Sequence, residues 1–411
     1  MNAGWTWERR PFRGGRLLGG RRPGGVAFVG VLGPLLAAGL TARAPDAALA
    51  ATAVPTPAQA TAAHRVRCGD TVRRDTTLTA DLSKCRGNGL VVGADGITLD
   101  LNGHTISGKG GGSGIVATGR RAVHITGSGL VHRFETAVLL KNTTGSQVDQ
   151  ITVKDNFFGV TVEGGSADTV FHITARRSYE AIRFLGGDRH LAVLNTVSDN
   201  GADASGIVLD QTTRARMVDN NISGAEFAGI WVDDADSNVV EANRMIDTGR
   251  GVLVFRGSRN RISYNHISGG PKWPRADGIA LFSGTTNVID HNVIEAVTED
   301  GITLSSFSPK GPAAIDTVVR GNLVRRAGRD GFAVNNHGPG VVHGTRLSGN
   351  RAERSGDDGF DVRSASTTIK RNVARSNADY GIVAVRGVTD GGHNRASRNG
   401  NRAQCRNVTC R

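Results

Sequence analysis

The segment SGDDGFDVRS (residues 355–364) concentrates groups that could exchange protons or bind a cation. It holds Asp358, Asp361 and Arg363, and a repeat described below places Tyr380 one unit further along the chain. Carboxyl groups that lie close together raise one another's pKa, attract a cation or recruit arginines. Beside a sugar carboxylate, such groups could neutralise charge and move a proton.

A repeat of 22 to 30 residues determines where such groups meet. Its first marker is glycine, apolar, any residue, apolar, and the second is an asparagine three positions after an apolar residue. Both markers lengthen in the same units. The first begins at Gly206, Gly229, Gly251, Gly278, Gly301, Gly331, Gly359 and Gly381, with weaker copies at Gly114, Ala137, Gly159 and Ala181. The second falls at Asn195, Asn221, Asn243, Asn265, Asn292, Asn322, Asn350, Asn372 and Asn394.

These units predict short strands separated by Gly, Asn, Asp and Ser turns, and no stretch after residue 50 shows sustained helical periodicity. So small a unit cannot bury an apolar side alone, but it can do so by stacking on the next unit. We therefore expect an all-β solenoid of parallel strands with roughly 12–13 coils, in which the asparagines form a hydrogen-bonded ladder.

Two N-terminal motifs carry a family resemblance. They are CGDTV…LTADLSKC, from Cys68 to Cys85, and DGITLDLNGHTISG, residues 95–108. With the repeats, they resemble the single-stranded right-handed parallel β-helix of the pectate-lyase-like superfamily, including NosD-like and carbohydrate-active members. The resemblance implies one β-helix domain over 68–411. This superfamily includes lyases, hydrolases, epimerases and binding proteins, so an activity must be argued from a site.

A column of aspartates precedes the repeat glycine in four units: Asp277, Asp300, Asp330 and Asp358. Asp-Gly is a common turn pair, because aspartate bonds to nearby backbone and glycine accepts positive φ. The same column would place carboxylates on adjoining turns, which makes Asp300, Asp330 and Asp358 candidate calcium ligands. Both interpretations stay open at this point.

Strand alternation places a second set of groups beside the column. The third residue of each glycine unit is expected to face outward. From Gly206 onward, Asp361 is the only charged residue at that position, and Arg363, two residues later, lies on the same face. The preceding unit continues into a loop that we expect to lie beside Arg363. The candidate catalytic residues are His337, Asp358, Asp361, Arg363 and Tyr380. The candidate substrate-binding residues are Trp273, Asp277, Asp300, Asp330, Asn335 and Asn336.

These groups favour β-elimination or C5-epimerisation of uronic acids in an acidic polysaccharide. GFDVRS is similar to the Asp-Pro-His segment of mannuronan C5-epimerases at Asp361, although Val362 and Arg363 replace its Pro and His. One alternative is a non-catalytic carbohydrate-binding, cell-wall-binding or adhesion module. A second is an inverting hydrolase, since GDDGF and NNHG resemble elements of polygalacturonases in the opposite order.

The N-terminus predicts export. Residues 1–50 combine an arginine-rich start, an apolar run and an Ala-x-Ala site, and residues 51–67 read as a disordered leader. The sequence leaves a Sec or a twin-arginine route open. The four cysteines favour the disulfides Cys68–Cys85 and Cys405–Cys410, as in proteins outside the cytoplasm.

Composition narrows the classes of molecule that the protein could bind. The net charge of +13 favours anionic partners, whereas the 5% of aromatic residues and the expected export argue against nucleic acid. Scattered histidines and three methionines give no copper or zinc pattern, so calcium is the one cofactor considered. We expect a monomeric, secreted protein with no membrane span in its mature form.

Overall fold

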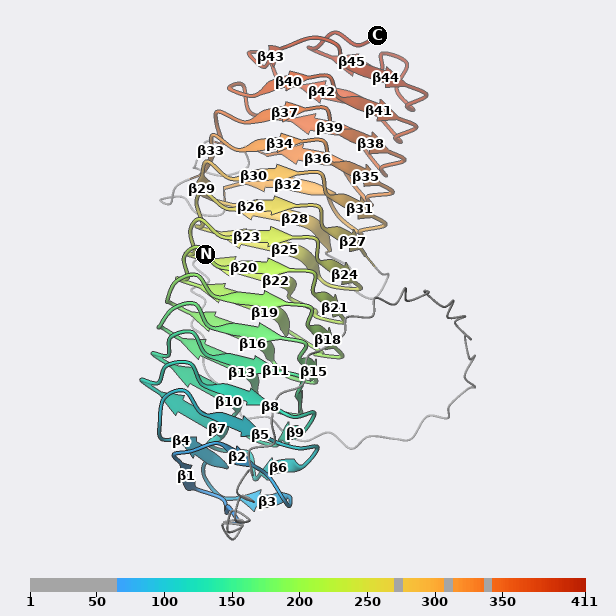
Figure 1. The fold of residues 1–411 in the computed structure, drawn as a ribbon. Coiled ribbons are helices and arrows are strands. Elements are labelled where there is room, and N and C mark those ends of the chain that lie inside the picture. Colours follow the sequence, from blue (N-terminus) through green and yellow to red (C-terminus); the bar gives the residue numbers. More distant parts are fainter. Residues whose placement is uncertain (1–64, 270–275, 307–312, 336–341) are drawn as a thin grey trace, which may run out of the picture. The chain divides into compact units, whose positions relative to one another are not determined.

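The structure is a computed structural model that describes residues 65–269, 276–306, 313–335 and 342–411. Over these ranges the chain forms 45 strands, and no helix occurs among them. Each turn of the chain adds one strand to each of three parallel sheets, which contain 15, 14 and 14 strands (Figure 1). No helix of the described residues could cross a membrane.

The candidate site residues that the structure describes lie on or next to strands of the first sheet. These strands are β1 (Asp70–Val72), β4 (Leu90–Val92), β7 (Ser113–Thr118), β10 (Thr136–Lys141), β13 (Phe158–Glu163), β16 (Glu180–Leu185), β19 (Ser205–Asp210), β22 (Ala228–Asp233), β25 (Arg250–Phe255), β28 (Asp277–Phe282), β32 (Ile302–Ser305), β36 (Phe332–Val334), β39 (Phe360–Val362), β42 (Ile382–Ala384) and β45 (Cys405–Arg406). The second sheet contains β2 (Thr76–Thr77), β5 (Thr98–Asp100), β8 (His124–Thr126), β11 (Gln147–Asp149), β14 (Thr169–Phe171), β17 (Leu191–Val193), β20 (Arg216–Val218), β23 (Val239–Glu241), β26 (Arg261–Ser263), β30 (Val288–Asp290), β34 (Val318–Arg320), β37 (Arg346–Ser348), β40 (Thr368–Lys370) and β43 (Thr389–Asp390). The third contains β3 (Leu82–Cys85), β6 (Thr105–Gly108), β9 (Leu130–His132), β12 (Thr152–Lys154), β15 (Thr174–Arg176), β18 (Thr196–Ser198), β21 (Asn221–Ser223), β24 (Arg244–Ile246), β27 (His266–Ser268), β31 (Val293–Glu295), β35 (Leu323–Arg325), β38 (Arg351–Glu353), β41 (Val373–Arg375) and β44 (Arg395–Ser397). A short pair, β29 (Gly284–Thr285) and β33 (Ala314–Ile315), lies outside them.

The predicted right-handed parallel β-helix is confirmed. Aliphatic side chains at equivalent positions pair in register, for example Ile230 with Val252, and both are fully buried. Such rows form one continuous core along the stack. There are 14 complete turns and a final strand, β45, which exceeds the expected 12–13 coils. The recognised glycine markers begin at Gly114 and so omit the two N-terminal turns, β1–β3 and β4–β6, although Gly89 before β4 fits the same pattern.

An asparagine ladder joins nine successive turns, as predicted, with one change of residue. Each side-chain amide donates to the Oδ1 atom of the next asparagine, over 2.9 to 3.3 Å. The member between Asn195 and Asn243 is Asn220 and not Asn221, so that assignment was wrong. The adjacent asparagines made the register ambiguous in sequence, whereas Asn221 is an exposed residue of β21.

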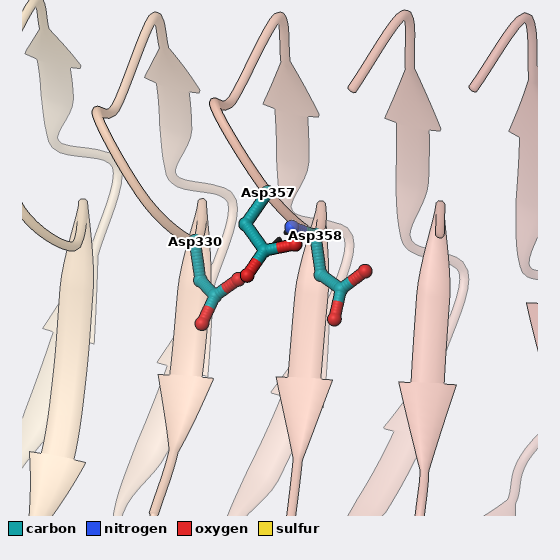
Figure 2. A group of neighbouring side chains, drawn as sticks. All are labelled: Asp330, Asp357 and Asp358. Atoms are coloured by element: carbon teal, nitrogen blue, oxygen red, sulfur yellow. Dashed lines mark hydrogen bonds between the residues drawn. The ribbon is translucent and has the colours of Figure 1, made fainter. Parts of the chain in front are cut away.

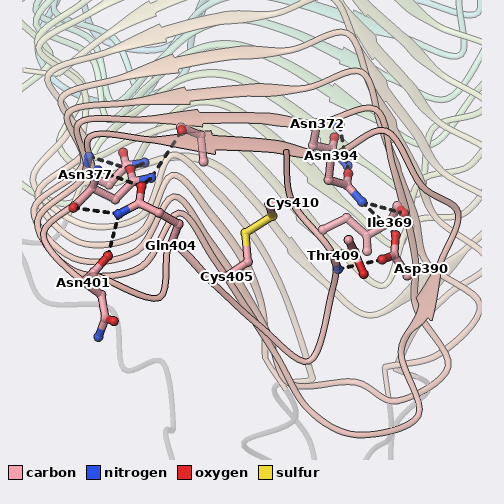
Figure 3. Close-up of a disulfide and its surroundings, with 12 residues drawn as sticks. Ile369, Asn372, Asn377, Asp390, Asn394, Asn401, Gln404, Cys405, Thr409 and Cys410 are labelled. Carbon is pink, nitrogen blue, oxygen red and sulfur yellow. Dashed lines mark hydrogen bonds between the residues drawn. A yellow bond between two sulfur atoms is a disulfide. The ribbon is translucent and has the colours of Figure 1, made fainter.

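Both predicted disulfides are present, and each lies at one end of the β-helix. Cys68–Cys85 ties the segment before β1 to the end of β3, with 5.5 Å between the Cα atoms. Cys405–Cys410 closes the loop after β45 (Figure 3). In the same view, the Gln404 side chain accepts from Asn399 and donates to the Asn401 carbonyl, which covers the end of another asparagine row. The predicted export signal and all but residues 65–67 of the leader lie outside the described residues.

Candidate active site on the first sheet

The repeat glycines allow adjoining turns to approach closely where the chain enters the first sheet. A Cβ atom on Gly331 would lie 2.6 Å from the Gly359 carbonyl oxygen, and one on Gly301 would lie 2.5 Å from that of Gly331. None of the four glycines that follow the aspartates has a positive φ. The expectation that positive φ explains these Asp-Gly pairs was therefore wrong, and the tight spacing between turns is the cause.

The four aspartates before these glycines form a ladder of their own. The backbone N–H of Asp358 donates to Asp330 Oδ1 over 2.9 Å, and the N–H of Tyr380 donates to Asp358 Oδ1 over 2.8 Å. The N–H groups of Asp300 and Asp330 donate in the same way to the preceding aspartate, over 3.3 and 3.2 Å. Each carboxyl group thus uses one oxygen to join two turns.

Burial raises the pKa of every member of this column. The pKa of Asp330 rises to about 8, because the group is buried and because the charge of Asp300 lies nearby. The pKa of Asp358 rises to about 7 through burial and through the charges of Asp357 and Asp361. The pKa of Asp277 rises to about 6, mainly by burial, and that of Asp300 also rises. These carboxyl groups can therefore hold or release a proton near neutral pH.

Arginines neutralise part of this acidity. The Arg250 guanidinium lies 3.4 Å from Asp277 Oδ2, which counteracts the effect of burial on that carboxyl group. Arg329 pairs with Glu299 over 3.3 Å and lowers the pKa of Asp300 through its charge. Arg363 donates from Nε to Asp361 Oδ2 over 2.7 Å. Asp361 faces outward as predicted, but it is only 4% exposed.

The predicted residues line two cavities on this face. Asp358, Asp361, Arg363 and Tyr380 surround a cavity of about 740 Å³. Asp277, Asp300 and Asn335 line a neighbouring cavity of about 260 Å³. Asp330 lies in the column between Asp300 and Asp358. His337, Trp273 and Asn336 lie outside the described residues.

Several lining residues escaped the sequence interpretation. Arg386, Arg406 and Asn407 border the larger cavity, and Arg406 is opposite Val383 in the pairing of β42 with β45. No repeat motif marks that last strand, so no sequence signal pointed to Arg406 and Asn407. Arg329 borders the smaller cavity and stands two positions before the repeat glycine, in phase with Glu299. That phase could have identified it.

Three carboxylates meet where two turns adjoin. Oxygens of Asp330, Asp357 and Asp358 lie within 4.8 Å of one another (Figure 2). Asp330 and Asp358 are buried, and Asp357 is exposed. Among the described residues, this is the one group of three or more His, Cys, Asp or Glu side chains so arranged. Oxygen ligands of this kind suit a hard cation such as Ca²⁺.

Two families match parts of the chain. Residues 205–346 match the family described as right handed beta helix region, and residues 102–272 match the periplasmic copper-binding protein (NosD) family. The chain has no match among curated proteins.

Solved structures with similar folds include one in complex with a pentasaccharide and one of an alginate epimerase. The tailspike protein of E. coli bacteriophage HK620, in complex with a pentasaccharide, is 14% identical, with a TM-score of 0.52 over 83% of this chain and 73% of that chain. The periplasmic alginate epimerase AlgG is 12% identical, with a TM-score of 0.46 over 68% of this chain and 77% of that chain. At these identities the likeness extends to the fold alone.

The residues present do not fit a copper site. Copper favours imidazole, thiolate or thioether ligands. Over the described ranges, the converging ligand group consists of three carboxylates, and all four cysteines are in disulfides. The described methionines, Met217 and Met245, are buried in the core. The name of the matched family therefore does not carry over to this chain as a copper-binding function.

Proposed function

We propose that this right-handed parallel β-helix repeat protein binds an acidic polysaccharide along the outer face of its first sheet. We further propose that it acts on the uronic acid residues of that polysaccharide by β-elimination or C5-epimerisation. The observation that carries the proposal is the larger cavity, where arginines and a carboxyl group with a pKa of about 7 face the same space. The disulfides and the N-terminal pattern support action outside the cytoplasm.

The arginines supply the first requirement of this chemistry. Removing the C5 proton of a uronic acid leaves negative charge on its carboxylate, which cations nearby must stabilise. Arg386 and Arg406 border the cavity, and among the described residues neither forms an ion pair. Arg363 is held by Asp361 at the same rim. We assign these three guanidinium groups to the substrate carboxylate.

Proton transfer supplies the second requirement. We assign Tyr380, as the phenolate, to remove the C5 proton; His337, whose role stays a prediction from the sequence, would first take the phenolic proton. The electron pair of the C5–H bond then forms the C4–C5 double bond, and the C4–O bond breaks while protonated Asp358 donates a proton to the leaving oxygen. In epimerisation no C–O bond breaks, and C5 regains a proton on its opposite face.

Non-catalytic binding is the alternative that a specific observation favours. Each column aspartate accepts a backbone N–H of the next turn, so its presence has a structural explanation without any turnover. An inverting hydrolase fits less well, because oxygens of Asp330, Asp357 and Asp358 lie within 4.8 Å. Inverting enzymes hold their two carboxyl groups roughly 6.5–9.5 Å apart.

Turnover assays with a conservative variant test the proposal. Pectate, alginate and glycosaminoglycans would be incubated with the protein, with ultraviolet absorbance reporting an unsaturated product and NMR reporting inversion at C5. Tyr380→Phe should lower turnover by about 100-fold or more, because only the phenolic oxygen is lost. Tyr264→Phe is the control, since Tyr264 is 53% exposed and borders neither cavity. Binding of these polymers without product formation would overturn the catalytic assignment and support a binding module.

A further inference from the structure

The outer face of the first sheet changes its chemistry along the stack. Two positions before the repeat glycine, the later turns carry Glu299, Arg329 and Asp357, whose backbones are joined from turn to turn. The same position in earlier turns holds aromatic residues: Tyr179 donates its N–H to the Phe157 carbonyl over 2.9 Å. At this position the later turns are therefore charged and several earlier turns are aromatic, while Arg183 places a charge on the outer face of the earlier turns as well.

The aromatic residues of the earlier turns are Phe157, Phe158, Tyr179, Phe227 and Trp231, which we call the aromatic strip. The rings of Phe157 and Tyr179 stack at 5.0 Å and 12°, and Phe157 is 46% exposed. Phe227 and Trp231 meet edge to face at 5.0 Å. These rings lie on the outside of the β-helix, and Phe227 and Trp231 pack against a small apolar cluster that is separate from the interior core.

Polar atoms without partners accompany the aromatic strip. In the described part of the chain, Trp231 Nε1 and Thr161 Oγ1 are buried and form no hydrogen bond. Thr161 is 3% exposed and faces outward from β13, and Trp231 occupies the equivalent position of β22. A buried polar atom without a partner costs about 1–3 kcal/mol, so a water or another polar group is expected beside each of them.

The row that contains these atoms continues to the acidic cavity. Register pairs connect Trp231 to Leu253, Leu253 to Ala280, and Ala280 to Thr303, which lines the smaller cavity. Parallel strands are about 4.8 Å apart, so four turns place Trp231 roughly 19 Å from the turn of Asp330. The aromatic strip and the acidic column thus lie on the same sheet, and Leu253 and Ala280 between them are buried.

We propose that the aromatic strip is a second binding subsite for sugar rings of the same polysaccharide, and this rests on the proposed function. The apolar C–H faces of a sugar ring suit stacking on aromatic side chains. Because the strip is several turns from the acidic column, it contributes to the binding of long chains and not to that of short oligomers.

Oligomer length gives a direct test. Affinities of uronate oligomers of about 2 and about 12 units would be measured by calorimetry for wild type, Trp231→Ala and Trp231→Phe, because only the long oligomer can span the roughly 19 Å between the two parts. Trp231→Ala should weaken binding of the long oligomer about tenfold and leave that of the short oligomer unchanged. Trp231→Phe keeps an aromatic ring and should lower the affinity for the long oligomer about threefold. Tyr264→Ala, on another corner of the β-helix, should change neither affinity.

Each other outcome has a distinct meaning. If neither oligomer binds the wild-type protein, the proposed function fails. If both bind but Trp231→Ala weakens neither, or weakens both equally, the second subsite is overturned while the proposed function stands. If Trp231→Ala lowers the melting temperature and leaves both affinities intact, the strip packs against the protein's own chain, which also overturns the subsite.

Discussion

Replacing Asp330 by asparagine should stabilise the protein, and increasingly so as the pH rises. The substituted amide would keep an Oδ1 acceptor for the Asp358 N–H, which donates to Asp330 over 2.9 Å. The folded-state pKa of Asp330 is about 8, against 3.8 for the ordinary carboxyl group. Below pH 3.8 the group is protonated in both the folded and the unfolded state, so it imposes no penalty. As the pH rises towards 8, ionisation favours the unfolded chain, and the penalty is complete above the folded pKa.

The size of the effect follows from that difference. At 1.36 kcal/mol per pH unit, the interval from 3.8 to about 8 sets an upper limit of about 6 kcal/mol. Asp330 is coupled to three other carboxyl groups, and hydration or a bound cation relieves part of the cost. We expect Asp330→Asn to raise the free energy of unfolding by about 2 kcal/mol at pH 8, and by less than about 0.5 kcal/mol at pH 4.

Urea unfolding at the two pH values provides the assay. A chelator must be present, because a cation held by Asp330, Asp357 and Asp358 would mask the carboxylate repulsion. Asp219→Asn is the matched control, since Asp219 lies in a turn outside the column and the same atoms change. A variant that is no more stable than wild type at pH 8, or that gains equally at both pH values, would refute the reasoning. If Asp330→Asn is less stable than wild type only when the chelator is absent, the three carboxylates bind a cation.

The remaining predictions concern the ladder and the pH dependence of turnover. Asn220→Ala should lower the free energy of unfolding by about 3 kcal/mol, because Asn220 accepts from Asn195 and donates to Asn243 inside the core. The same substitution at the adjacent residue, Asn221→Ala, should lower it by less than about 0.5 kcal/mol. Urea midpoints measure both, and equal costs would contradict the assigned register. Turnover of acidic polysaccharide should fall as the pH rises through about 7, because Asp358 must be protonated to act as the acid. A pH–rate profile that stays flat from about pH 6 to about 9 would exclude Asp358 from that role.

Much of the fold was predictable, because each repeat unit carries residues that make the same contacts with the next turn. Glycine and asparagine markers in phase require that successive turns lie on one another, and this stacking brings Asp300, Asp330 and Asp358 together. The local cause was less accessible. The glycines after these aspartates are needed for close approach between turns and not for positive φ, and a turn motif within one unit cannot reveal contacts with the next.

The candidate site was predictable only where it follows the repeat. Asp358, Asp361 and Tyr380 stand at fixed positions relative to a repeat glycine, so their common face could be inferred. Arg406 lies on the final strand, which lacks the motif, and it reaches the cavity only because β45 adds to the edge of the first sheet. The burial that raises the pKa of Asp330 depends on side chains from several turns, and no single unit of the sequence encodes it.

The two disulfides have a consequence for assembly. In a stack of parallel strands, unpaired backbone N–H and C=O groups remain only at the first and last turns, and such edges can recruit another chain. Cys68–Cys85 and Cys405–Cys410 fasten the segments at those two ends. Reduction would free both segments, and copies of the protein could then join end to end into a fibre. Intact disulfides would thus preserve discrete particles as well as the stability of each one.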